Sequence, residues 1–335
     1  MSNNVKTPFR LPGRVRLSNY RLKITIWNIV YKFCRAVLLF GLCFLILQPL
    51  LDKLSVSFMD TQDLYDATVI SIPRNFTLKN YAMVDQLLGY WPSLFQTTVI
   101  VVISAALQVA ACTMAAYGFA RYKFPLKNFW FMCVMLIIVV PPQTIMSSLY
   151  LNFHFFDVFG LIRLITGEPF NMLNSVFGYW MLSATGMGLK SGLYIFLLRQ
   201  YFRGVPKELE EAAWVDGCGR FKTFIRIMLP DAGPMITSCF LFSFVWQWTD
   251  SFYSTLFLGN YKMLARGLSG ISDRLGQVWN AMNDASGAVY SAAPVAVTQA
   301  IIATGVLVCL APLILLYLAA QKAFVESLSQ TGIKM

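Results

Sequence analysis

The stretch WPSLFQTTVIVVISAALQVAACTMAAYGFA, at Trp91–Ala120, contains no charged side chain. A helix that crosses a bilayer needs about 20 consecutive, mainly apolar residues, and this stretch is longer than that. A helix on the surface of a soluble protein carries polar and charged residues on the face that meets water. The stretch therefore predicts a transmembrane helix.

The composition of the whole chain also indicates a membrane protein. Apolar residues make up 57% of the 335 residues and charged residues 13%, whereas roughly 25% of residues are charged in a soluble domain. The alternative, a soluble protein with an oversized core, does not explain apolar runs that are long enough to cross a bilayer. We expect an all-α, polytopic integral membrane protein.

Six apolar stretches have the length of a membrane span. They are Val30–Leu51, Trp91–Ala120, Asn128–Leu151, Asn171–Tyr201, Ala232–Leu258 and a helix within Ala285–Gln321. The third contains Pro141 and Pro142, which a span tolerates because neighbouring helices and waters satisfy the carbonyls that proline frees. The fifth contains an acidic residue, Asp250.

The charges between these stretches predict their orientation, because cytoplasmic segments collect lysine and arginine. The segment before residue 36 has no acidic residue and carries Lys6, Arg10, Arg14, Arg16, Arg21, Lys23, Lys32 and Arg35. The loop 52–90 is mainly acidic, and the loop 199–230 is rich in basic residues. Six spans then place both termini in the cytoplasm. The net charge of +11 reflects this topology and contact with anionic lipids rather than binding of nucleic acid.

The predicted spans and loops divide the chain into four parts. These are a basic cytoplasmic leader (1–29), the first transmembrane helix with an outer loop (30–90), a transmembrane core (91–322) that includes a coupling loop at 206–230, and a cytoplasmic tail (323–335).

The sequence contains little that would support enzyme chemistry. It has one histidine, His154, at a predicted membrane boundary, and it has neither a Gly-x4-Gly-Lys-Ser/Thr phosphate loop nor a Gly-x-Ser-x-Gly elbow. Its seven cysteines include no Cys-x-x-Cys pair, which disfavours a zinc site and a disulfide framework. We expect no enzyme activity, no cofactor and no metal site.

The loop PKELEEAAWVDGCGRFKTFIRIMLP, Pro206–Pro230, predicts two helices joined by a turn. Pro206 suits the first position of a helix, and glutamates follow where the helix dipole favours negative charge. Gly217 and Gly219 suit a left-handed turn that ends this helix. The second helix, Arg220–Leu229, has an apolar face. From periodicity alone, the unit is either a rigid knob for another protein or an amphipathic loop on the bilayer.

Seven residues of this loop match the pattern Glu-Ala-Ala-x3-Gly-x9-Ile-x-Leu-Pro. They are Glu211, Ala212, Ala213, Gly217, Ile227, Leu229 and Pro230. The pattern and its spacing resemble the EAA motif of ABC importer permeases, which favours the first of the two interpretations.

Four other stretches are similar to carbohydrate permeases of the MalG type, from maltose transporters. They are LLRQYFRGVPKELEEAA (Leu197–Ala213), AAYGFARYKFPLKN (Ala115–Asn128), FTLKNY (Phe76–Tyr81) and QKAFVESLSQTGIKM (Gln321–Met335). The last departs from the usual ending at Glu326-Ser327, Gln330 and Met335. The resemblance covers about residues 75–335.

This resemblance implies a MetI-like fold with six transmembrane helices and a role in importing a carbohydrate across a bacterial cytoplasmic membrane. The implied partners are a dimeric ABC ATPase that hydrolyses the ATP, a second homologous permease of the MalF type in a heterodimer, and an extracytoplasmic solute-binding protein. The implied ATPase-coupling residues are Glu210, Glu211, Ala212, Ala213, Asp216, Gly217, Ile227, Leu229 and Pro230. The tail residues Gly332, Ile333 and Lys334 are implied to reach toward the ATPase.

A candidate substrate path involves Trp246, Trp248, Asp250 and Lys190. The stretch WQWTD resembles a Trp-x-Trp-Asn-Asp stretch of the family, with Thr249 in place of asparagine. Aromatic faces with a few polar groups suit sugar rings, yet tryptophan also favours membrane interfaces. Lys190 has three explanations: it lines the path, it pairs with Asp250, or it marks a chain break after Gly186-Met187-Gly188.

Two other functions are consistent with parts of the sequence. One is an importer permease for a solute other than a sugar. The other is a stand-alone channel or secondary transporter, a class in which inverted repeats are common. The sequence shows no convincing internal repeat, and such a carrier has no use for an EAA loop.

Overall fold

The computed structural model describes residues 14–157, 160–286 and 293–332, and the chain divides into two compact units, 1–55 and 56–335. Throughout the described residues the regular elements are helices, and strand pairing is limited to two isolated bridges, Met59 with Phe76 and Phe156 with Phe170. The all-α prediction is therefore confirmed.

The first unit consists of the long helix α1 (Arg14–Ser57), apart from its last turn. Its apolar part runs from Ile24 to Ser57, and begins earlier than the predicted Val30. Large apolar side chains project from all around it, including Trp27 at 73% and Phe40 at 75% exposure. A helix that is apolar all round belongs in a membrane or a protein core, so α1 fits the first predicted span.

The second unit is built around α4 (Tyr90–Arg121). This helix packs against α8 (Val176–Ala184), α9 (Ser191–Gly204) and α13 (Gly233–Thr249). Small residues at the contact, among them Ala105, Cys112 and Ala116, are fully buried. Such residues let helix backbones approach closely in a membrane. Helix α13 packs in turn against α17 (Val295–Gly332), and α5 (Lys127–Val139) packs against α9.

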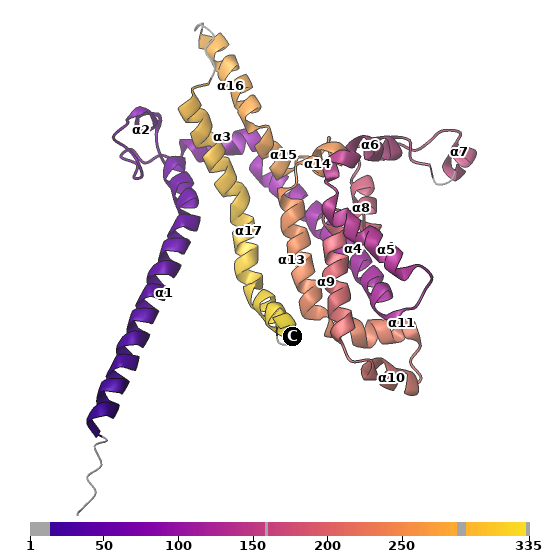
Figure 1. Ribbon diagram of the computed structural model, residues 1–335. Coiled ribbons are helices and arrows are strands. Elements are labelled where there is room, and N and C mark those ends of the chain that lie inside the picture. The colour runs from indigo at the N-terminus through magenta and orange to yellow at the C-terminus, as the bar shows by residue number, and fades with distance from the viewer. Residues whose placement is uncertain (1–13, 158–159, 287–292, 333–335) are drawn as a thin grey trace, which may run out of the picture. The chain divides into compact units, whose positions relative to one another are not determined.

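Short helices lie at the ends of these long ones (Figure 1). In Figure 1, α10 and α11 lie at the opposite end of α9 and α13 from α14 and α15. The short elements are α2 (Thr61–Tyr65), α3 (Lys79–Leu88), η1 (Pro142–Ile145), α6 (Met146–His154), α7 (Leu161–Thr166), α10 (Glu208–Val215), α11 (Arg220–Thr223), the π turn η2 (Phe224–Met228), α12 (Leu229–Asp231), α14 (Phe252–Phe257), α15 (Leu264–Ser269) and α16 (Ile271–Ser286).

The structure offers three to five membrane spans among the described residues. Three helical stretches are long and apolar enough on their own: Ile24–Ser57, Tyr90–Arg121 and Val295–Lys322. Two bent pairs can each count as one more span: α5 with Pro142–His154, at 104°, and Arg220–Asp231 with α13, at 75°. The fourth predicted span, Asn171–Tyr201, is divided between two shorter helices, α8 and α9.

The predicted break near Gly186–Gly188 is confirmed, because α8 ends at Ala184 and α9 begins at Ser191. Gly186 (φ 71°) and Lys190 (φ 63°) both adopt left-handed backbone conformations there. The extent of the fifth predicted span is wrong. Helix α13 ends at Thr249, and Asp250 lies between α13 and α14 rather than inside a helix.

A buried polar cluster around Gln108 joins three helices at the middle of α4. The Gln108 Nε2 donates to the Leu189 carbonyl (2.8 Å) and to Ser191 Oγ (2.7 Å). Its Oε1 accepts from Ser243 Oγ and from Gln247 Nε2, both at 2.7 Å. Fully satisfied networks of this kind fix one arrangement of a core. The cluster therefore fastens the α8–α9 break to α4 and α13.

Replacing Gln108 with leucine is expected to lower the thermal stability of the chain. The substitution orphans buried groups of Ser243, Gln247 and Leu189, and each orphaned group costs about 1–3 kcal/mol. Thermal unfolding in detergent, followed by tryptophan fluorescence, measures the effect. The control is Gln277→Leu on the exposed face of α16, where a change within about 0.5 kcal/mol is expected. Equal unfolding temperatures for both variants would contradict a structural role for the cluster.

Candidate functional site

The candidate site is the hairpin formed by α10, α11, η2 and α12, residues 208–231, called here the 208–231 hairpin. Three glutamates occupy the first turn of α10: Glu208, Glu210 and Glu211. Negative charge there is favourable because the unpaired N–H groups of a helix start carry partial positive charge. The predicted first helix is thus confirmed, with its start at Glu208 rather than at Pro206.

The turn after α10 is closed by Gly217, whose φ is 78°. The Cys218 N–H donates to the Ala213 carbonyl (2.9 Å), and the Gly217 N–H donates to the Trp214 carbonyl (3.0 Å). This pair of bonds is the Schellman ending of a helix, which favours glycine at the left-handed position. The predicted left-handed turn is confirmed at Gly217 and wrong at Gly219, whose backbone is extended at the start of α11.

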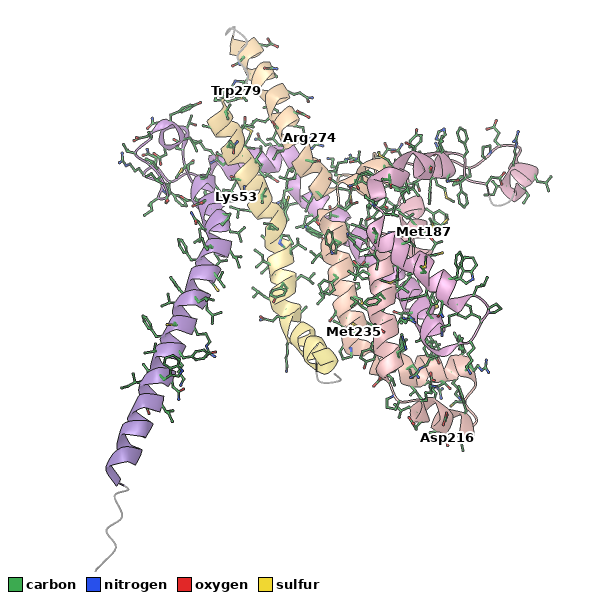
Figure 2. All side chains as sticks on the ribbon, viewed as in Figure 1. Lys53, Met187, Asp216, Met235, Arg274 and Trp279 are labelled. Carbon is green, nitrogen blue, oxygen red and sulfur yellow. The ribbon has the colours of Figure 1, made fainter. Side chains whose placement is uncertain are left out.

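The tip of the hairpin exposes one part of the predicted coupling set. Glu211, Ala212, Asp216 and Gly217 are all exposed, and Figure 2 labels Asp216 at the far end of the hairpin. Three apolar side chains beside them are also exposed: Leu209 at 45%, Trp214 at 47% and Val215 at 88%. The sequence prediction missed these three. They could have been found as apolar residues within an otherwise charged stretch that is predicted to be helical.

Glu210 and Ala213 of the same predicted set lie on the opposite face of α10 and are buried, each at 4% exposure. Glu210 Oε1 accepts a hydrogen bond from the Tyr117 hydroxyl (2.8 Å), and Oε2 lies 3.4 Å from Arg121 Nε. Positions three apart share a face of a helix, which explains why both turn inward. A partner cannot reach them directly, so their geometry fits a role in positioning the exposed tip.

The Glu210–Arg121 ion pair ties the hairpin to the end of α4. Both side chains are at least 93% shielded from solvent, at 6% and 7% exposure. Arg121 Nη2 also donates to the Val205 carbonyl at 2.6 Å, which fixes the chain just before the hairpin. A buried charge is tolerated only when it is paired. The hairpin and α4 therefore form one rigid connection.

The second arm of the hairpin packs on the same end of α4. Phe224 and Met228 are buried, and the rings of Tyr117 and Phe224 lie 4.7 Å apart between centroids. Phe224–Met228 forms a π turn, in which the Leu229 N–H bonds to the Phe224 carbonyl. Pro230 follows, and since it has no N–H it cannot extend the ladder.

The remaining residues of the predicted set shape the junction with α13. Ile227 and Leu229 are half-buried and Pro230 is exposed, just before the 75° bend into α13. The predicted second helix is therefore present, but it contains the π turn and ends at Asp231. The hairpin is thus joined both to α4 and to α13.

The predicted tail contacts fall at the end of the described chain. Gly332 is the last residue of α17, whereas Ile333 and Lys334 lie outside the described residues.

Three of the four predicted substrate-path residues, Lys190, Trp246 and Asp250, line a cavity of about 280 Å³. The Lys190 ammonium lies 5.1 Å from the centroid of the Trp246 ring, a distance at which a cation and an aromatic face attract. Pro142, from the bend between α5 and α6, lines the same cavity. The cavity therefore lies where two interrupted segments, at Pro142 and at Lys190, meet the end of α13.

The side chains of Asp250 and Trp248 are occupied by structural contacts. Asp250 lines the cavity, but its carboxylate accepts the backbone N–H groups of Phe252, Tyr253 and Ser254 at 3.0–3.2 Å and so caps α14. The described ion pairs include none between Asp250 and Lys190. Trp248 is buried, and its Nε1 donates to the Cys309 carbonyl of α17 at 3.1 Å. Trp246 and Lys190 are thus the two path residues whose side chains remain available to a solute.

Similar proteins agree with this arrangement. The profile of the family described as binding-protein-dependent transport system inner membrane component matches residues 108–330. The alpha-glucoside transport system permease protein AglG of Rhizobium meliloti is 33% identical over 56% of this chain and 46% of that protein. The osmoprotective compounds uptake permease protein GgtD of Synechocystis is 31% identical over 61% of this chain and 64% of that protein. The chain thus spans about half to two thirds of these relatives.

One solved structure shares the fold. It is the crystal structure of a bacterial ABC transporter involved in the import of the acidic polysaccharide alginate, with a TM-score of 0.66 and 18% sequence identity. The match covers 95% of this chain and all of the matched chain. At this identity the likeness shows the fold alone.

We expect Glu210→Ala to destabilise the hairpin strongly, because it leaves Arg121 as a buried, unpaired charge. Breaking a buried pair on one side costs about 3–5 kcal/mol. Thermal unfolding and protease cleavage within residues 208–231 report the loss. The matched control is the neighbouring Glu211→Ala, which removes an exposed carboxylate and is expected to change stability by about 0.5 kcal/mol or less. Similar sensitivity of the two variants would show that the ion pair does not hold the hairpin.

Proposed function

Because the chain belongs to the family of binding-protein-dependent transport system inner membrane components, we propose that it is the permease subunit of an ATP-driven importer that carries a carbohydrate into the cytoplasm. The observation that carries this proposal is the 208–231 hairpin. Its EAA residues divide into an exposed tip and a buried base, and the base is fastened to α4 by the Glu210–Arg121 pair. Such a lever has a use only if another protein moves it.

The mover in this proposal is a dimeric ABC ATPase. The ATPase contacts the exposed tip of the hairpin, at Glu211, Ala212, Trp214, Val215, Asp216 and Gly217. The other residues of the predicted coupling set hold the hairpin in place against α4 and α13. They are Glu210, Ala213, Ile227, Leu229 and Pro230. Closure of the ATPase dimer on ATP then biases the transmembrane helices from an inward-open toward an outward-open arrangement, as a shift between existing states. Hydrolysis takes place on the ATPase and not on this chain.

We infer the membrane arrangement from the charges and the apolar helices together. The multi-pass chain has six spans in the bacterial cytoplasmic membrane, with α8 and α9 together counted as one of them. Both termini, with the basic leader 1–29, are cytoplasmic, and the tail 323–335 approaches the ATPase through Gly332, Ile333 and Lys334. The basic residues of the hairpin, Arg220 and Lys222 among them, favour the cytoplasmic side.

Two further partners complete the proposed importer. A second, homologous permease of the MalF type forms a heterodimer with this chain, and an extracytoplasmic solute-binding protein delivers the solute. The name of the matched family, which refers to binding-protein-dependent transport, supports the second of these partners.

The proposed substrate path passes the cavity at Lys190 and Trp246. An aromatic face packs against the C–H face of a sugar ring, and a few polar groups around it set the orientation. Lys190 donates hydrogen bonds to hydroxyl oxygens, and Asp250 balances the charge of Lys190 across the cavity. Trp248 joins α13 to α17 through its bond to the Cys309 carbonyl.

A second candidate function is import of a small solute that is not a nutrient sugar. The observation that favours it is the similarity to the osmoprotective compounds uptake permease of Synechocystis. The hairpin mechanism is the same for both, and only the solute differs. A stand-alone channel or secondary carrier would leave the hairpin without a partner.

Gly217→Pro is expected to abolish uptake and to leave membrane insertion intact. Proline fixes φ near −65°, whereas position 217 requires φ 78°, so the exposed tip loses its shape. Labelled-sugar uptake, with membrane content measured by immunoblot, tests this. The matched control is Gly167→Pro, which changes another exposed left-handed glycine (φ 83°) in a different loop and should transport normally. Normal uptake by the Gly217→Pro variant would contradict a coupling role for the tip of the 208–231 hairpin.

Trp246→Ala is expected to reduce uptake about tenfold or more while the assembled transporter keeps its ATPase activity. The substitution removes an aromatic face from the cavity without touching the hairpin, and a lost aromatic contact costs about 0.5–1.5 kcal/mol beyond the loss of buried area. Uptake kinetics and ATP hydrolysis are measured on the same reconstituted sample. The control, Trp130→Ala, removes a half-exposed indole from α5 and should affect neither. Unchanged uptake in the Trp246 variant would remove this cavity from the path.

A further inference from the structure

A second cavity, of about 180 Å³, lies away from both the hairpin and the Lys190 cavity. It is enclosed by the turn between α3 and α4 on one side and by α15 and the start of α16 on the other. Three basic side chains line it: Lys262, Arg266 and Arg274. Arg274 is labelled in Figure 2, where α16 leaves the junction with α15.

Two of these side chains are fixed in place by backbone carbonyls. Arg274 Nη1 donates to the Leu87 carbonyl at the end of α3 (3.0 Å), and Arg266 Nη1 donates to the Leu258 carbonyl after α14 (2.7 Å). Arginines near the last carbonyls of helices often make such bonds. Helix capping explains one N–H of each guanidinium, but each has five, and it does not explain Lys262.

The basic side chains of this cavity, Lys262, Arg266 and Arg274, have no ion-pair partner among the described residues. The acid on the adjoining turn of α3, Asp85, accepts the Tyr90 N–H at 3.3 Å. Burial and the nearby charge of Arg274 lower the pKa of the Arg266 guanidinium. Like charges held together around a small space favour an anion between them.

The level of the cavity in the membrane points to the kind of anion. The cavity adjoins the first turn of α4, where Tyr90 and the 70% exposed Trp91 lie, and these two residue types mark the headgroup level of a bilayer. The cavity therefore lies at the level where lipid headgroups meet the ends of the helices.

We propose that the cavity formed by Gly89, Ser93, Lys262, Arg266 and Arg274 binds a phosphate group, supplied by the headgroup of an anionic phospholipid. Its volume accommodates a phosphate and leaves the acyl chains outside. Arginine and lysine bind phosphate oxygens through charge-assisted hydrogen bonds. Bound there, the headgroup links the α3–α4 turn to α15 and α16, in addition to the bond from Arg274 to the Leu87 carbonyl and the close packing of Gly267 against Leu88.

Native mass spectrometry of the full-length chain in detergent tests this inference with three probes: phosphatidylglycerol, diacylglycerol, which has no phosphate, and inorganic phosphate. The wild type is expected to retain phosphatidylglycerol, and Lys262→Gln is expected to bind it about fivefold to tenfold more weakly. This variant is chosen because the Lys262 ammonium is not a donor in any described hydrogen bond that holds the fold. Lys262→Arg should restore binding, and Lys79→Gln, on an exposed lysine outside the cavity, should bind as the wild type does.

The three probes distinguish a lipid headgroup from free phosphate as the group bound in the cavity. Retention of phosphatidylglycerol that inorganic phosphate does not displace supports a lipid headgroup. Binding of inorganic phosphate that is lost in Lys262→Gln, with displacement of the lipid, supports the same site with free phosphate as its ligand. Equal retention of diacylglycerol, or equal lipid binding by the wild type and Lys262→Gln, would overturn the site. None of these readouts depends on transport.

Discussion

A backbone inside a bilayer has no water to bond with, so each N–H and carbonyl must find a partner within the protein. Continuous helices meet this constraint by themselves, and the second unit is held together where they are interrupted. The Gln108 amide takes up the Leu189 carbonyl in the α8–α9 break. The Thr144 hydroxyl bonds to the Pro141 carbonyl at the bend after α5, and Asp250 receives three N–H groups after α13. Hydrogen bonds therefore hold each of these interruptions in a defined conformation.

The same interruptions create the space that a solute path needs. Elsewhere along α4, small buried residues such as Ala105, Cys112 and Ala116 let the helices pack closely. Where Pro142 and Lys190 interrupt the chain, the backbones separate and a cavity of about 280 Å³ opens beside Trp246. Binding sites in helical membrane proteins commonly lie at broken helices, because the freed polar groups and the space occur together. Stability and the candidate path thus depend on the same residues.

The 208–231 hairpin combines a buried ion pair on one face of α10 with an exposed surface on the other. Glu210 and Glu211 are neighbours in sequence and have the same chemistry, yet one is buried against Tyr117 and Arg121 and the other meets solvent. The inward carboxylate sets the orientation of α10. The outward face, with Trp214 and Val215, is then free to meet a partner. Coupling to a partner would need both features, because without the buried ion pair the exposed tip could move without moving α4.

The helical membrane class, the left-handed turn at Gly217 and the family could be predicted from sequence alone, because these follow from local properties: apolar length, glycine geometry and fixed motif spacing. The break near Gly186 was one of three explanations that the sequence left open for Lys190. The tertiary structure decided which motif residues face outward, that Asp250 caps α14, and that Trp248 contacts α17 while Trp246 faces a cavity. These outcomes depend on contacts between residues far apart in the chain, such as Tyr117 with Glu210 and Gln108 with Gln247. A helical period alone predicts two opposite faces but not which of them is covered, since that depends on where the neighbouring helices pack.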